Sequence, residues 1–136
     1  MARYGRAVAS PIGRLDVAAF DCPDPHALAS FYRSIIGGRL VEHPRGGWVE
    51  VHTSEGKIAF QRIDDHRRPT WPEGEVPQQA HLDIDVDDLD VGEAAVVERG
   101  ATKADHQPSP ADFRVFLDPA GHPFCLVRPW PEQRPE

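Results

Sequence analysis

The sequence predicts an α+β fold built from two similar βαβββ units. Three observations support this prediction: an internal repeat with a nearly constant offset, an alternation of polar and apolar residues typical of strands, and a capped helix at the same place in each half. When Val17 is aligned with His81, Gly56 and Gly121 fall in corresponding hairpin turns. The chain is therefore predicted to contain two copies of one structural unit.

The first strand of the second unit shows the alternation most clearly. In HLDIDV, residues 81–86, His81 and Asp83 alternate with apolar residues. Side chains two residues apart share a face of a strand, so one face is predicted to pack in the core and the other to carry polar groups. The corresponding stretch of the first half, residues 14–22, places Val17 where the second half has His81.

The rest of each unit follows the same order. Residues 24–38 and 88–100 are predicted helices, because each begins with Asp, a favourable N-cap, and ends with Gly, a common C-cap residue. Apolar residues recur at helical spacing more strongly in the first helix than in the second. Three short strand-like runs then follow each helix: RLVEH (39–43), WVEVHT (48–53) and KIAFQRI (57–63), and then TKADH (102–106), FRVFLD (113–118) and PFCLVRP (123–129).

These elements divide a single domain, residues 1–136, into two units. The proline-containing connector between them is predicted to be extended and partly ordered by Trp71. The boundaries are 14–63 for unit one, 64–78 for the linker, 79–128 for unit two and 129–136 for a frayed tail.

Composition excludes several classes of protein. With 40% hydrophobic and 27% charged residues, the chain is typical of globular proteins. A net charge of −7 argues against binding nucleic acid or an anionic membrane surface, and no apolar run resembles a signal peptide or a membrane span. The two cysteines have no CxxC spacing, which favours a reduced, cytoplasmic setting.

Four stretches together resemble a known family. DPHALASFYRSIIGGRL, AHLDIDVDD, VVERGA and FLDPAGHPFCLV are similar to the glyoxalase/bleomycin-resistance/extradiol-dioxygenase superfamily, also called vicinal oxygen chelate proteins, and to its glyoxalase-like domain branch. The resemblance implies that each unit forms a curved mixed sheet with its helix outside. It also implies that two such sheets enclose a cleft, paired either within one chain or by exchange between two chains, and that the protein forms a homodimer.

The resemblance also implies four metal-ligand positions, which here are Val17, Gln61, His81 and Cys125. Val17 cannot bind a metal, and a thiol suits the oxygen-seeking ions Mg²⁺ and Mn²⁺ poorly. We therefore expect a degraded site with no cofactor. If a divalent ion does bind, its expected ligands are His81, Gln61 and Cys125.

His81 is the leading functional candidate of unit two. It is predicted to face the cleft with Asp83 beside it, and a nearby carboxylate makes an imidazole a better base. The alternative is a structural histidine that binds a backbone group. A Cys125–His81 nucleophile pair is a further alternative, although no oxyanion hole is visible in the sequence.

Trp48, Glu50 and His52 alternate with valines and are predicted to line the cleft from unit one. Trp48 offers a stacking surface, and Glu50 offers an acid, a base or a counter-ion; the alternative is an edge tryptophan shielding the sheet beside a solvated Glu50. Phe113 takes the place of Trp48 in the second half. The expected ligand-binding set is Trp48, Glu50, His52, Gln61, His81, Asp83, Phe113 and Cys125, with His81 and Glu50 as catalytic candidates.

The leading functional hypothesis is a small-molecule-binding protein that holds an aromatic or cationic organic ligand between the two units. A second hypothesis is a lyase, isomerase or dioxygenase of the same superfamily that uses His81, with or without a metal. A third is a structural or protein-interaction module whose cleft is filled by side chains.

Overall fold

The computed structural model of the protein describes residue 5 and residues 11–128. The predicted tail, 129–136, lies outside the described residues. Within them, no helix has the length and apolar character that a membrane crossing requires.

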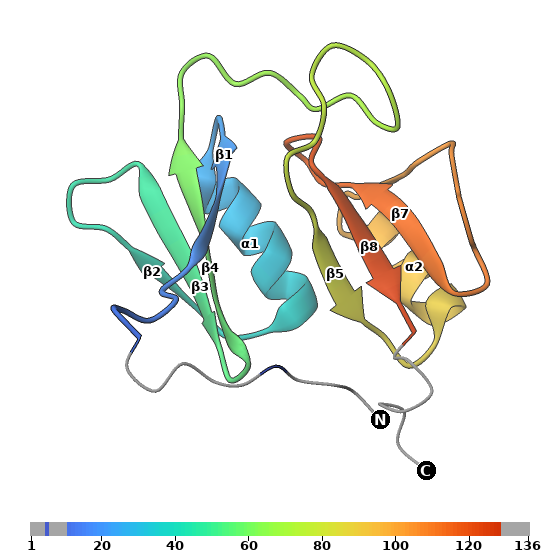
Figure 1. The fold of residues 1–136 in the computed structure, drawn as a ribbon, viewed down its shortest axis with the longest axis horizontal. Helices are drawn as coiled ribbons and strands as arrows, with labels where there is room; N and C mark the ends of the chain where they lie inside the picture. Colours follow the sequence, from blue (N-terminus) through green and yellow to red (C-terminus); the bar gives the residue numbers. More distant parts are fainter. Residues whose placement is uncertain (1–4, 6–10, 129–136) are drawn as a thin grey trace.

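Two units with the same topology make up the fold (Figure 1). Unit one contains β1 (Ala18–Cys22), α1 (Pro25–Ile36), β2 (Arg39–Glu42), β3 (Trp48–Thr53) and β4 (Gly56–Arg62), in the sheet order β1-β4-β3-β2. Unit two contains β5 (Leu82–Asp85), α2 (Leu89–Glu98), β6 (Thr102–Lys103), β7 (Phe113–Leu117) and β8 (Pro123–Val127), in the order β5-β8-β7-β6. In both sheets the first strand is parallel to the last, and the other pairs are antiparallel. The predicted pair of βαβββ units is confirmed.

Both helices begin at the predicted caps. The Asp24 side chain accepts a hydrogen bond from the Ala27 amide at 3.1 Å, and the Asp88 side chain accepts one from the Val91 amide at 3.0 Å. These bonds satisfy amides that have no partner within the first helical turn. Gly37 ends α1 with φ = 79°, a conformation that favours glycine.

One strand is shorter than predicted. The run at 102–106 forms only the two-residue strand β6. Beyond it the Ala104 amide still donates to the Val115 carbonyl at 3.0 Å, but the return bond from the Val115 amide goes to the side chain of Gln107. Its amide nitrogen donates to the carbonyls of Ala104 and Val115 at 2.8 Å, and its oxygen accepts from the Val115 amide at 2.9 Å. The Gln107 side chain thus satisfies the Val115 amide of β7, for which a backbone partner was expected.

The hydrophobic core is shared between the units. In each sheet one face, which we call the helix face, packs against helices, and the opposite face is called the open face. Tyr32 of α1 stacks on Phe60 of β4 with ring centroids 5.3 Å apart, and its ring also meets Phe124 of β8 at 5.8 Å. Phe60 and Phe124 are fully buried residues of the two helix faces. One helix of unit one therefore packs against both sheets.

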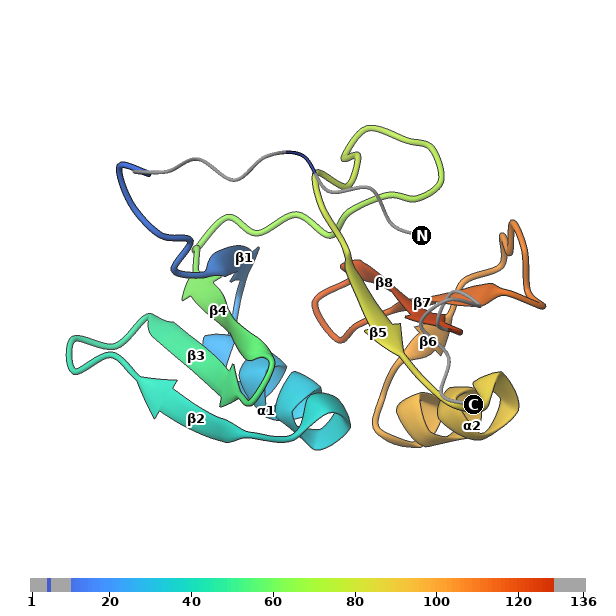
Figure 2. The same ribbon diagram turned by 60° about the horizontal axis from the view of Figure 1, so that its bottom comes forward.

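This shared core decides where the open faces lie. Figure 1 shows α1 between the two sheets, and Figure 2 shows α1 and α2 on the same side of the molecule. The open faces therefore lie on the outer flanks of the core and do not face each other within the chain. The predicted fold class is confirmed. Of the two ways to pair the sheets that the sequence leaves open, the packing of Tyr32 against Phe60 and Phe124 does not favour a cleft enclosed within one chain.

A buried carboxylate reinforces the contact between the units. Asp118, which follows β7, is 2% exposed and accepts a hydrogen bond from the Tyr32 hydroxyl at 2.6 Å. It also accepts bonds from the amides of Ala120 and His122 at 2.9 and 3.0 Å. Burial, with the adjacent Asp118, raises the pKa of Tyr32 well above its ordinary value, so the hydroxyl remains a donor.

Candidate functional site

A pocket of about 630 Å³ lies over the open face of unit two. The sheet forms its floor, and residues of the linker form part of its wall. Its lining includes His81, Asp83, Phe113, Val115, Cys125 and Val127 from unit two, and Trp71 and Gln78 from the linker. A hollow with apolar walls and a few convergent polar groups is typical of a small-molecule site.

The polar end of the pocket is formed by three side chains. Asp83 lies directly opposite Cys125 in the parallel β5–β8 pairing, and His81 precedes Asp83 by two residues on the same face. His81 Nε2 lies 3.2 Å from Asp83 Oδ1, and one potential ligand atom from each residue lies within 4.8 Å of the others.

Cys125 differs from its two neighbours in burial. It is 7% exposed, and burial, with a smaller effect of Asp83, raises the pKa of its thiol to about 12. The thiol is therefore protonated near neutral pH, which argues against a Cys125–His81 nucleophile pair, since the thiolate is the nucleophile.

The other predicted residues of unit one form a separate group on its open face. The Trp48 indole donates to Glu50 Oε2 at 2.8 Å, and His52 Nε2 lies 2.7 Å from Glu50 Oε1. Lys57 Nζ lies 3.9 Å from Glu50 Oε1. The hydrogen bond from Trp48, followed by the contact with His52, holds the pKa of Glu50 below its ordinary value. Glu50 is thus a fixed carboxylate.

The structure does not bring the eight predicted site residues together. His81, Asp83, Phe113 and Cys125 line the pocket of unit two, whereas Trp48, Glu50, His52 and Gln61 belong to the open face of unit one and do not line it. Each residue lies on the predicted face of its strand. The separation follows from the shared core, which turns the two open faces outward.

Sequence reasoning missed the linker's contribution to the pocket. Trp71 and Gln78 both line the pocket, and the ring centroids of Trp71 and His106 are 5.4 Å apart. A tryptophan within a proline-containing linker was the available signal, but no strand periodicity indicates which unit such a residue will cover. Val127, by contrast, could have been inferred, because it alternates with helix-face residues on the strand that carries Cys125.

The four metal-ligand positions implied by the resemblance do not form a ligand set in this chain. Val17 has no donor atom, and Gln61 is exposed on β4 of unit one, where it pairs with Trp48 and Asp21 rather than approaching His81. The residues present therefore do not fit the metal centre expected for that set.

Comparison with known proteins agrees with the topology. The family model described as a glyoxalase-like domain matches residues 17–127. The chain belongs to this glyoxalase-like domain family.

Solved structures show the same fold. A glyoxalase/bleomycin resistance protein/dioxygenase family enzyme from Burkholderia phytofirmans PsJN superposes with a TM-score of 0.63 at 18% identity, over 83% of this chain and 96% of that one. Fosfomycin resistance protein FosX from Mesorhizobium loti gives 0.62 at 17% identity, over 91% and 98%. A hypothetical protein from S. aureus gives 0.62 at 15% identity, over 88% and 100%. No curated protein matches the sequence.

Proposed function

We propose that the protein binds a small organic molecule, aromatic or cationic, in the pocket of unit two. The observation that carries the proposal is the pocket itself: a hollow of about 630 Å³ with apolar walls and a polar end at His81, Asp83 and Cys125. This volume is within the range of cavities that hold drug-sized ligands. The proposal needs no metal at the family positions.

The wall residues support an aromatic or cationic ligand. Trp71 and Phe113 offer aromatic surfaces for stacking or for cation–π contact. Asp83 and Asp112 supply negative charge, against one lining arginine, Arg128. Sequestration of a toxic compound is one use of such binding, and the resistance protein among the structural neighbours is consistent with it.

We further propose that a homodimer completes the site. The open face of unit one carries Trp48, Glu50 and His52 already joined by short contacts, yet none of them lines the pocket of its own chain. A second copy can place this face over the pocket, which adds a fixed carboxylate for a cationic ligand. The buried, unpaired cysteines are compatible with the reduced cytoplasm that we propose as the location.

A metal-independent proton-transfer enzyme is the second candidate. The 3.2 Å contact between His81 and Asp83 at one end of an apolar pocket favours it, because a carboxylate orients an imidazole that acts as a base. Turnover of a bound ligand that is lost in His81→Ala but retained in Asp85→Asn would support the enzyme hypothesis. Binding of a ligand without turnover would support the binding-protein hypothesis instead.

The test is a thermal-shift screen with aromatic ammonium compounds and matched neutral and anionic aromatics. We expect the cationic members to raise the Tm, by mass action on the folded state. Val127→Trp fills the pocket and should abolish the shift, whereas Val97→Trp on the exposed face of α2 should retain it. Shifts that survive Val127→Trp would exclude this pocket, and no shift with any compound would contradict the proposal.

Sedimentation tests the dimer separately. Wild-type protein should sediment as a dimer, and Trp48→Arg, which places an unpaired charge on the open face of unit one, should shift the equilibrium toward monomer. A monomeric wild type that still binds the ligand would contradict the composite site but retain the pocket.

A further inference from the structure

The part of the linker that borders the pocket is a loop closed at its base. Thr70 and Pro77 pair as a β-bridge, the Thr70 amide donates to the Val76 carbonyl at 2.6 Å, and the Val76 amide donates to the Thr70 hydroxyl at 3.0 Å. Trp71 and Gln78 each follow a bridge partner by one residue, and both line the pocket. The base of the loop therefore presents an indole ring and an amide group to the same ligand.

The amide of Gln78 has an acceptor without a donor. Its Oε1 atom is buried, and in the part of the chain that the structure describes it is the one buried side-chain oxygen or nitrogen that has no hydrogen-bond partner. A buried acceptor left unpaired costs free energy, which a ligand with a donor group can recover. Because no protein donor holds this oxygen, the soft terminal torsion of the side chain can turn it toward the pocket without breaking a hydrogen bond.

The charges of the pocket indicate which kind of donor fits. Asp83 and Asp112 line the wall, and ionised carboxylates only accept hydrogen bonds, whereas Arg128 is the one arginine or lysine among the lining residues. A protonated primary or secondary amine has a positive charge and at least two N–H donors, so it can bond to an amide oxygen and a carboxylate together. A quaternary ammonium group has the charge without a donor, and an alcohol has a donor without the charge.

We infer that Gln78 determines the specificity of the pocket and that the ligand is an aromatic compound with a protonated primary or secondary amine. The ring of the ligand stacks on Trp71, and one N–H of its ammonium group donates to Gln78 Oε1. The inference rests on the proposed function, because it narrows the aromatic or cationic ligand of the same pocket to one class. Gln78 acts here as a binding residue of the linker and takes no part in any catalytic step.

Three compounds with the same ring test the inference: 2-phenylethylammonium, its trimethylammonium analogue and 2-phenylethanol. Calorimetry on the wild type at neutral pH should show binding of the primary ammonium about tenfold or more tighter than that of either analogue. Gln78→Met keeps the length of the side chain and removes the amide. It should reduce the preference for the primary over the quaternary ammonium by about fivefold to tenfold, and leave the affinity for the quaternary compound unchanged.

Gln79→Met is the matched control, because Gln79 is exposed and does not line this pocket. It should keep the preference of the wild type. Without ligand, Gln78→Met should have a Tm no lower than that of the wild type, since it removes an unpaired buried oxygen.

The possible failures are distinguishable. Equal binding of the primary and quaternary ammonium compounds, or a preference that persists in Gln78→Met, would overturn the inference and leave the proposed function intact. A lower Tm of ligand-free Gln78→Met would also overturn it, because the amide would then have a structural partner. If no aromatic compound of any charge binds, the proposed function fails, and this inference fails with it.

Discussion

Units one and two share a topology, but they contribute unequally to the hydrophobic core. Helix α1 buries an aromatic and aliphatic set and packs against both sheets, with Phe31 and Tyr32 each meeting Phe124 of unit two. Helix α2 buries only Leu89 and Val96, and leaves Val91 67% exposed. A repeat in sequence therefore does not imply an equal contribution to the core.

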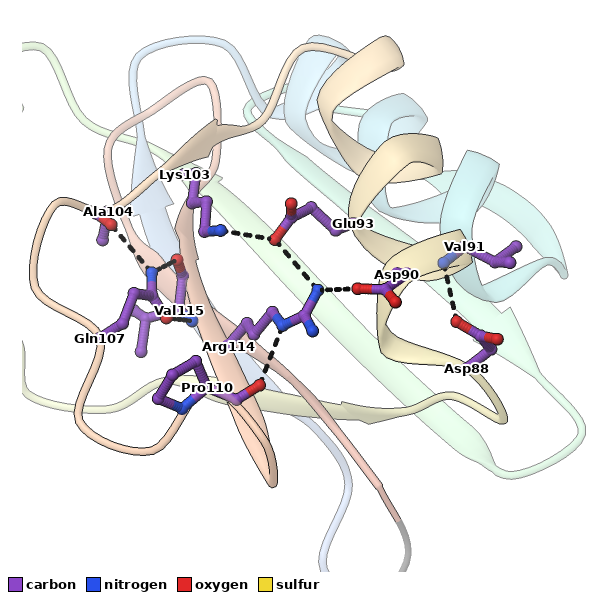
Figure 3. A network of polar contacts seen from close by, with 10 residues as sticks. All are labelled: Asp88, Asp90, Val91, Glu93, Lys103, Ala104, Gln107, Pro110, Arg114 and Val115. Carbon is purple, nitrogen blue, oxygen red and sulfur yellow. Dashed lines mark hydrogen bonds and ion pairs between the residues drawn. The ribbon is translucent and has the colours of Figure 1, made fainter.

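Polar contacts hold α2 to its sheet where α1 uses apolar ones. Arg114 of β7 occupies a helix-face position and reaches Asp90 at 2.8 Å and Glu93 at 3.4 Å, while Lys103 reaches Glu93 at 2.9 Å (Figure 3). Arg114 also donates to the carbonyl of Pro110 at 3.0 Å. Ion pairs near a surface contribute little to stability compared with buried aromatic contacts.

The open faces differ in the same way. Unit one carries Glu50 fixed by Trp48 and His52, none of which lines the pocket described above, whereas the sheet of unit two forms the floor of that pocket. The difference indicates that unit one mainly supplies the core and an outward polar surface, and unit two supplies the cavity.

The largest expected effect tests the unequal helices. Leu28→Ala in α1 should lower the free energy of unfolding by about 2–5 kcal/mol, because Leu28 is only 2% exposed and its loss leaves a cavity. Val97→Ala in α2, where the side chain is 46% exposed, should change it by no more than about 0.5 kcal/mol. Chemical denaturation measures both, and equal losses would contradict the comparison.

The contact between the units gives the next effect. Tyr32→Phe removes the hydroxyl that donates to the buried carboxylate of Asp118, and should cost about 1.5–3 kcal/mol. Ser109→Ala removes a hydroxyl that donates to Asp112 on the surface, and should cost no more than about 0.5 kcal/mol. If the urea midpoints of the two variants coincide, the Tyr32–Asp118 hydrogen bond does not stabilise the packing of one unit on the other.

The ion-pair network of α2 should contribute less. Arg114→Met should lower the free energy of unfolding by no more than about 1 kcal/mol. Asp90 is 86% exposed and stays hydrated, and Glu93 retains its ion pair with Lys103. The difference from wild type should shrink in high salt, which screens charges. A larger, salt-independent loss in thermal unfolding would mean that α2 depends on this network as strongly as α1 depends on its apolar contacts.

The smallest effect concerns Glu50 and pH. Because the folded-state pKa of Glu50 is lowered, the ionised carboxylate adds stability above the ordinary value of 4.5, and this stability is lost as pH falls through the lower folded value. Glu50→Gln should therefore cost a few tenths of a kcal/mol at pH 7 and nothing at the acidic end. Urea unfolding at pH 7 and at pH 3 measures the difference; a constant difference between the two would show that Glu50 is not held as a carboxylate.

The sequence by itself determined the local features of this protein. It placed both helices with their Asp24 and Asp88 caps, both hairpin turns, and the face on which each strand residue lies. Periodicity, capping and turn chemistry act between residues close in the chain, so one sequence suffices to predict them. The end of β6 escaped prediction because it depends on a side-chain bond from Gln107.

The tertiary structure decided how the two units meet. Tyr32 touches Phe60 of its own unit and Phe124 of the other, and this contact between distant residues turns both open faces outward. It thereby separates Glu50 from His81, and the pocket beside His81 takes Trp71 of the linker as part of its wall. No local pattern encodes which apolar surfaces will pack together, because burial is favourable for any of them and only their shapes select the partner.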